Sequence, residues 1–285
     1  MLIKKLFYLY YILFSKNSIA YSILIYEFLR IIFFPLNLLF YYIENFLNKN
    51  KNSNIPIIFV IGSHRSGSTF VAQTLLRKLD VYGLNNLNNI FNRSSIIIPK
   101  LIKKLNINYG PVKNFYGQSK NLFDVNDNYQ VWDRWFGHDH DFIKKSMIIK
   151  RKDLREYFRN IYMTVKKPIL TKNGRNIFVI NELNMLFKNA FFIIVTRDHK
   201  NIVNSTMKAN KLLVNNKYAW GLKLNSRVKS VEKQCTEIKN YIQKNVNKLP
   251  KEKFLLIKYE KFLNKTNQKK LIKKIKKKIN VKSFN

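Results

Sequence analysis

The stretch GSHRSGST, residues 62–69, has residue types and spacing suited to holding a phosphate or sulfate group. It follows the apolar run 57–61 and precedes the helix-like stretch FVAQTLLRKL, so we expect a strand–loop–helix unit. Backbone N–H groups at a helix N-terminus bind anions, and Gly62 and Gly67 allow the backbone to approach a ligand closely. The sequence therefore predicts an anion site in this loop.

The same loop differs from the P-loop motif G-x-x-x-x-G-K-[ST] in the position of its cation. Ser68 stands where that motif has lysine, and Arg65 comes three residues earlier. Without the lysine, the loop lacks the cation that reaches the β- and γ-phosphates of ATP. The predicted ligand is therefore a phosphate or sulfate group, held by Ser63, His64, Arg65, Ser66, Gly67, Ser68 and Thr69.

A second strand–loop–helix pattern, FFIIVTRDHKNIVNSTM over residues 191–207, carries another pair of anion-binding side chains. Arg197 follows the apolar run and can make a forked contact with phosphate, and Ser205 lies on the next helix. Ligands of open α/β sheets bind at the carboxyl ends of the strands, where both segments would lie. The pattern indicates a ligand with two separated phosphate-like groups.

The hydrophobic pattern predicts an α/β fold of three layers with a central, mainly parallel sheet, similar to P-loop NTPases. Continuous apolar runs, typical of buried parallel strands, occur at 57–61, 168–171, 191–195 and 254–257. Helical periodicity occurs at 69–79, 129–136, 151–165, 177–187, 201–211 and 218–244. We expect this domain to occupy residues 51–285, with a basic tail at its end.

Residues 1–50 form a hydrophobic segment that is expected to be helical and associated with a membrane, leaving the catalytic domain in the cytoplasm. A spanning helix needs about 20 mostly apolar residues. The best window, 24–43, contains Glu27, Arg30 and Pro35, so both a span and a hairpin in the membrane surface remain open. Amphipathic helices packed on the α/β domain are the alternative.

The chain of 285 residues carries 53 Lys and Arg against 16 Asp and Glu, a formal net charge of +37. Such a charge suits anionic partners, including acidic lipid, but Lys, Asn and Ile are over-used throughout, which weakens the argument. No recognised nucleic-acid motif is present, so we expect no specific nucleic-acid partner. The basic stretch 271–284 could contact a membrane surface or a phosphate.

These motifs resemble the bacterial sulfotransferases that use 3′-phosphoadenosine 5′-phosphosulfate (PAPS). IFVIGSHRSGSTFVAQTLL resembles their 5′-phosphosulfate loop, G-x-x-R-S-G-[TS]-[TS], and AFFIIVTRDHKNIVNS resembles their 3′-phosphate segment. TKNGRNIFVINEL and FLLIKYEKFL resemble two further family segments, K-x-P-x-N and Y-E-x-[FL]. The resemblance covers about residues 55–275, although His199 and Gly174 stand where the family usually has proline.

The resemblance implies transfer of a sulfuryl group from PAPS to a hydroxyl acceptor, such as a glycan, a lipid head group or another small molecule. Arg65 would contact the 5′-phosphosulfate, and residues 66–69 would wrap around it. Arg197 and Ser205 would hold the 3′-phosphate. No metal is expected.

The general base that removes the acceptor proton is harder to assign. Many relatives carry a glutamate downstream of the loop, but the corresponding stretch here, VYGLNNLNNIFNRS, contains no carboxylate. Asp127, His138 and His140 are the favoured candidates, with Asp133 in the same cluster. A base must first reach the hydroxyl and then have a suitable pKa.

Two other interpretations remain open. One is a P-loop kinase or nucleotide-binding protein with an atypical loop, which binding of ATP with Mg²⁺ would favour. The other is a non-enzymatic basic protein that binds membrane or nucleic acid, in which case salt alone would abolish binding.

Overall fold

The computed structural model describes residues 10, 12–14, 16, 18–47, 54–115, 117–136, 151–213 and 230–279 of the chain. Two of the candidate bases, His138 and His140, lie outside these ranges. The first part of the helix predicted over 218–244 also lies outside them.

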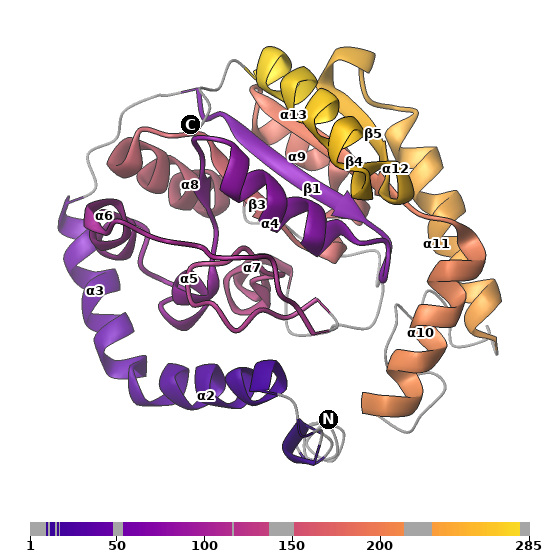
Figure 1. Cartoon of the computed structure of the whole chain (residues 1–285). Coiled ribbons are helices and arrows are strands. Elements are labelled where there is room, and N and C mark those ends of the chain that lie inside the picture. Colours follow the sequence, from indigo (N-terminus) through magenta and orange to yellow (C-terminus); the bar gives the residue numbers. More distant parts are fainter. Residues whose placement is uncertain are drawn as a thin grey trace.

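A five-stranded sheet forms the centre of the molecule, with the strand order β2-β3-β1-β4-β5 (Figure 1). The strands are β1 (Ile57–Gly62), β2 (Tyr82–Gly83), β3 (Ile169–Lys172), β4 (Ala190–Thr196) and β5 (Phe254–Lys258). All neighbouring strands run parallel, which confirms the predicted sheet and adds the short β2. The carboxyl end of β1 therefore lies between those of β3 and β4.

Helices cover both faces of the sheet and complete the three predicted layers. Side chains alternate between the two faces of a strand, so Ile58 and Val60 of β1 face one layer and Phe59 and Ile61 face the other. The first layer consists of α4 (Ser68–Lys78), α12 (Tyr259–Leu263) and α13 (Lys265–Ile279). The second contains α7 (Tyr129–Phe136), α8 (Arg151–Val165), α9 (Ile180–Leu186) and α11 (Val231–Val246).

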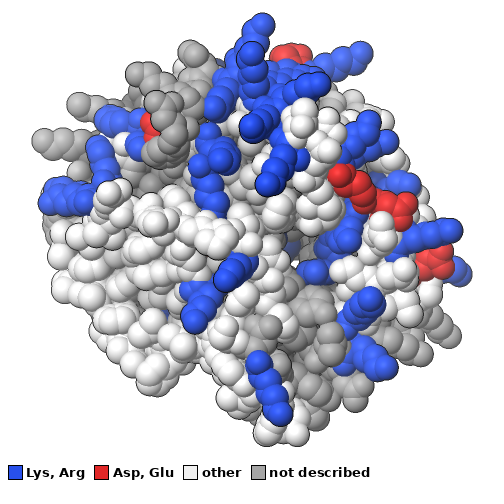
Figure 2. Space-filling model, viewed as in Figure 1, with Lys and Arg blue, Asp and Glu red and all other residues white. Residues whose placement is uncertain are grey.

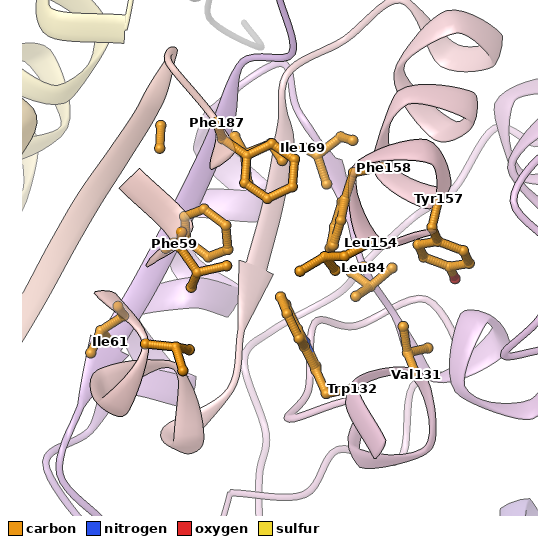
Figure 3. Packing of buried hydrophobic residues seen from close by; sticks show 14 of the residues in the cluster. Phe59, Ile61, Leu84, Val131, Trp132, Leu154, Tyr157, Phe158, Ile169 and Phe187 are labelled. Carbon is orange, nitrogen blue, oxygen red and sulfur yellow. The ribbon is translucent and has the colours of Figure 1, made fainter. Parts of the chain in front are cut away.

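Aromatic side chains fill the space between the sheet and the second helix layer (Figure 3). Trp132 of α7 is fully buried and stacks on Phe136, with 5.1 Å between the ring centroids. Its ring centroid lies 5.5 Å from that of Phe158 on α8. Large buried rings contribute strongly to a core. This packing holds α7, and the segment that precedes it, in a defined position beside the sheet.

The N-terminal segment forms two helices, α2 (Ser18–Ile32) and α3 (Phe34–Leu47), which lie against the α/β domain (Figure 1). The side-chain amide of Asn37 donates to Asn92 Oδ1 at 2.9 Å, and its oxygen accepts from the Arg93 backbone N–H at 3.2 Å. The Tyr26 hydroxyl donates to the Lys120 carbonyl at 2.6 Å. Packing on the domain, one of the alternatives expected from the sequence, is therefore found for these two helices.

Glu44 makes the tightest contact between α3 and the domain. Its buried carboxylate accepts hydrogen bonds from the backbone N–H groups of Ser95 and Ile97, at 2.6 and 2.8 Å, and from the Ser94 hydroxyl. These donors precede and begin α6 (Ile97–Lys104), so the carboxylate satisfies N–H groups that have no partner within that helix.

Within the described ranges, none of the helices is both long enough and apolar enough to cross a membrane alone. The pair α2 and α3 reaches the required length and hydropathy only when taken together, across a bend of 60°.

Candidate functional site

The loop between β1 and α4 is held in a shape that requires glycine. Gly67 precedes α4 with φ at +87°, a conformation that favours glycine. A Cβ atom added to Gly67 would overlap the ring of Tyr259, and one added to Gly62 would lie 2.8 Å from the Val195 carbonyl oxygen. The loop backbone is therefore packed directly between β4 and the Tyr259 ring.

The first turn of α4 and the loop contain the other residues predicted to bind the anion. Ser63 accepts the Ser66 backbone N–H at 3.2 Å, which closes the turn. Ser68 and Thr69 are buried in the first turn of α4, beside its unpaired backbone N–H groups. The predicted anion-binding residues of the loop thus gather at one helix N-terminus.

The two predicted anion-binding segments are in direct contact. The Arg65 Nε group donates a hydrogen bond to the Ser205 hydroxyl at 3.0 Å, from the loop to α10 (His199–Leu213). Arg197, which follows β4, donates from Nη1 to the Arg65 carbonyl oxygen at 2.9 Å. The structure therefore brings residues more than a hundred positions apart in the sequence into one cluster.

Arg197 is oriented by its neighbours. Its guanidinium carbon lies 5.0 Å from the centre of the Tyr259 ring, a cation–π arrangement. The following residue, Asp198, caps α10 by accepting the Asn201 backbone N–H at 3.1 Å, and its own N–H donates to Glu260 at 3.0 Å. Arg197 is thus positioned from α12, with the residue that follows it anchored to both α12 and α10.

Several polar atoms of the cluster are buried and have no hydrogen-bond partner within the described part of the chain. They are the hydroxyl of Ser66, Nε of Arg197 and Nδ1 of His64. Buried polar groups are rarely left unpaired, so each such group needs a physical reason. An anion bound here would accept from the hydroxyl and the guanidinium, which fits a phosphate- or sulfate-bearing ligand.

Asp127 lies on the other side of the loop and is held by three donors. Lys172 Nζ donates to Oδ2 at 2.5 Å, and the Gly174 backbone N–H donates to Oδ1 at 3.1 Å. The Asn173 side-chain amide donates to the Asp127 carbonyl oxygen at 2.6 Å. Each carboxylate oxygen therefore accepts one hydrogen bond, and the residue is tied to the carboxyl end of β3.

His64 is the loop residue that lies near this carboxylate. A Cβ atom on Gly174 would be 3.4 Å from His64 Cε1, so the imidazole packs against the turn that follows β3. Burial lowers the pKa of His64 to about 4; Lys172 and Arg65 act in the same direction, and Asp127 opposes them. The imidazole is therefore neutral at neutral pH.

Lys172 and Tyr259 join the cluster; their segments resemble family segments, but neither residue was predicted as a site residue. Lys172 ends β3, which pairs with β1. The sequence signal for its place in the cluster is a cation at the carboxyl end of a short apolar run. Tyr259 follows β5 and contacts both Gly67 and Arg197.

Asp133, in the predicted cluster of candidate bases, is buried against Arg175 and forms an ion pair with it at 2.5 Å.

Gly67→Ala is expected to lower the free energy of unfolding by about 1–3 kcal/mol more than Gly110→Ala does. Both glycines have positive φ, but a Cβ on Gly110 meets no atom within 4 Å, whereas one on Gly67 meets the Tyr259 ring. Urea denaturation of the two variants measures the difference. Equal losses would mean that Tyr259 does not pack on the loop.

Comparison with known proteins identifies the group to which this arrangement belongs. Residues 56–280 match the model of the sulfotransferase family. No curated protein sequence matches the chain significantly.

Two solved structures share the fold at low sequence identity. Sulfotransferase STF1 from Mycobacterium tuberculosis H37Rv is 12% identical, with a TM-score of 0.53 over 81% of this chain and 68% of that chain. Sulfotransferase STF9 from Mycobacterium avium is also 12% identical, with a TM-score of 0.53 over 81% of this chain and 64% of that chain. These likenesses concern the fold alone.

Proposed function

Since this chain belongs to the sulfotransferase family, we propose that it transfers a sulfuryl group from PAPS to a hydroxyl acceptor. The observation that carries the proposal is the contact of Arg65 with both Ser205 and Arg197. This contact joins the 62–69 loop, at the N-terminus of α4, to the segment that carries Arg197 and Ser205. A ligand with phosphate groups at two positions needs two such anion-binding segments side by side. The donor is a co-substrate, and no metal is part of the proposal.

The loop and Arg65 are proposed to bind the 5′-phosphosulfate end of the donor, which supplies the sulfuryl group when bound. The backbone N–H groups before and within the first turn of α4 donate to its oxygens, and the Ser66 hydroxyl, unpaired in the described structure, adds another donor. Arg65 stabilises the negative charge that develops on the leaving phosphate. Because the guanidinium and the N–H donors are already in position, they lower the free-energy barrier of the transfer.

Arg197 and Ser205 are proposed to bind the 3′-phosphate. The Arg197 guanidinium is held over Tyr259 and keeps its Nε donor unpaired in the described structure. Binding both ends of the donor would fix the reacting group near the carboxyl ends of β1 and β4. Such positioning accounts for much of the catalysis in group transfer of this kind.

Asp127, His138 and His140 remain the proposed candidates for the general base. Each oxygen of Asp127 already accepts a hydrogen bond, so uptake of a proton would compete with its ion pair to Lys172. His64 joins the candidates, because its imidazole is neutral and Nδ1 lacks a partner among the described residues. Lys172 then holds Asp127 and adds positive charge beside the loop.

A thermal-shift titration tests the proposed donor. We expect 3′-phosphoadenosine 5′-phosphate, the product form of the donor, to raise the melting temperature by about 5 °C at concentrations well above its Kd. ATP with Mg²⁺ should give no comparable shift, because the loop lacks the lysine that reaches the β- and γ-phosphates.

Ser205→Ala is the matched variant for this titration, since it removes the hydroxyl that Arg65 contacts without changing charge. It should reduce the shift produced by 3′-phosphoadenosine 5′-phosphate. A shift with ATP and Mg²⁺ alone would favour the kinase interpretation. Absence of a shift with both nucleotides would contradict the proposed donor.

A further inference from the structure

The outer face of α2 and α3 carries apolar side chains where a surface helix usually carries polar ones. Its exposed apolar residues recur at helical spacing: Tyr21, Ile25, Phe28 and Ile32 on α2, and Leu39, Tyr42 and Phe46 on α3. Phe28 is 62% exposed and Phe46 is 91% exposed. We call these seven residues the outer apolar face.

The charged residues of the two helices do not interrupt this face. Glu44 is buried against the start of α6. Arg30 pairs with Glu27 at 2.8 Å, and Glu27 also accepts from the Gln130 side chain at 3.2 Å, so this half-buried pair is tied to the start of α7. Among residues 18–47, all those classed as exposed are uncharged, and the Glu27 side chain, 38% exposed, is neutralised by Arg30. The helices thus direct their polar anchors to the domain and their apolar residues outward.

Exposed lysines lie on α6, the helix to which α3 is bonded. Glu44 accepts a hydrogen bond from the backbone N–H of Ile97, the first residue of α6, and this contact places the start of α6 against α3. The exposed residues of α6 and its end are Lys100, Leu101, Lys103, Lys104 and Leu105. Cations beside an apolar helix face suit a lipid surface, where acyl chains take up the apolar side chains and acidic head groups meet the lysines.

The geometry of the two helices favours a position in the plane of a membrane. They contain 15 and 14 residues, and at about 1.5 Å per residue each is about 22 Å long, short of the roughly 30 Å hydrocarbon core. Both are bonded to the domain along their inner sides, through Tyr26 on α2 and Asn37 and Glu44 on α3. The other side of each helix is exposed in the described part of the chain and could enter a bilayer surface.

We propose that the outer apolar face lies in the surface of an anionic lipid bilayer, with α2 and α3 parallel to its plane. The main group of exposed lysines lies elsewhere. Figure 2 shows the basic side chains gathered over α13 at the top, and few of them over α2 and α3 at the lower left. Binding through the outer apolar face is therefore distinct from attraction of the net charge to acidic lipid. It is also independent of the proposed sulfuryl transfer.

The test is co-sedimentation of the full chain with vesicles of phosphatidylcholine and phosphatidylglycerol. We expect the double variant Phe28→Asp and Phe46→Asp to lower the partition coefficient at least about tenfold, because two large apolar side chains no longer enter the lipid. The matched control is Met185→Asp with Leu263→Asp, which also replaces two exposed apolar side chains by aspartate, at positions 64% and 51% exposed on α9 and α12. This control should bind as the unmodified chain does.

Salt dependence and oligomeric state distinguish insertion of the outer apolar face from attraction by charge alone and from self-association. At high salt, the unmodified chain should keep part of its binding, since only the lysine contribution is screened. Complete loss of binding at high salt, or equal binding by the two double variants, would overturn the proposal. A dimer without vesicles that the Phe28→Asp and Phe46→Asp changes convert to a monomer would also overturn it, in favour of a second copy on this face. Matching melting temperatures establish that all variants fold.

Discussion

Arg65→Ala is expected to weaken the binding of 3′-phosphoadenosine 5′-phosphate by roughly 10- to 100-fold, measured by isothermal titration calorimetry. The guanidinium is lost from the loop, and with it the hydrogen bond to Ser205 that joins the loop to α10. A hydrogen bond to a charged group contributes roughly 1.5–3 kcal/mol, which corresponds to this change in affinity. The backbone contact from Arg197 to the carbonyl of residue 65 does not depend on the side chain and should remain.

Two controls define what Arg65 contributes. Arg30→Ala makes the same charge change on α2, where the side chain pairs with Glu27, and should leave the affinity unchanged. Arg65→Lys keeps the charge but removes the Nε donor that Ser205 accepts, so an intermediate affinity is expected. If Arg65→Ala bound the nucleotide as tightly as Arg30→Ala does, the loop would not be the nucleotide site.

Glu44→Ala is expected to lower the free energy of unfolding by roughly 3–5 kcal/mol. The buried backbone N–H groups of Ser95 and Ile97 would lose their acceptor, at about 1–3 kcal/mol each, and a small cavity would add to the loss. The same change frees α3 from the start of α6. Denaturant unfolding of the purified chain measures the loss, and limited proteolysis should cut near α3 more readily in the variant.

Glu252→Ala is the matched control, because Glu252 is exposed in the short turn before β5. Its removal changes the net charge by the same amount, so the stability should change by less than about 0.5 kcal/mol. Similar stability of the two variants would show that the N-terminal helices do not dock on the domain through Glu44.

The strands and several helices could be predicted because their signals are local. Continuous apolar runs gave β1, β3, β4 and β5 within one or two residues, and helical periodicity gave α7 and α8 at the bounds found in the structure. The region 177–187 was predicted as one helix, but a 3₁₀ turn over Gly174–Phe178 precedes α9 there. The short α5 (Asn86–Ile90) was missed, since five asparagine-rich residues carry too little periodicity.

The two predicted anion-binding segments and the strands that carry them could be recognised in the amino-acid order alone, since glycine, hydroxyl and arginine residues at fixed spacing after apolar runs are local patterns. The contact of Arg65 with Ser205, the pairing of Lys172 with Asp127, and the lowered pKa of His64 emerge only on folding. The same holds for the side of α2 and α3 that faces outward. These features depend on strand order and helix packing, which join residues far apart in the chain, and no local pattern encodes such contacts.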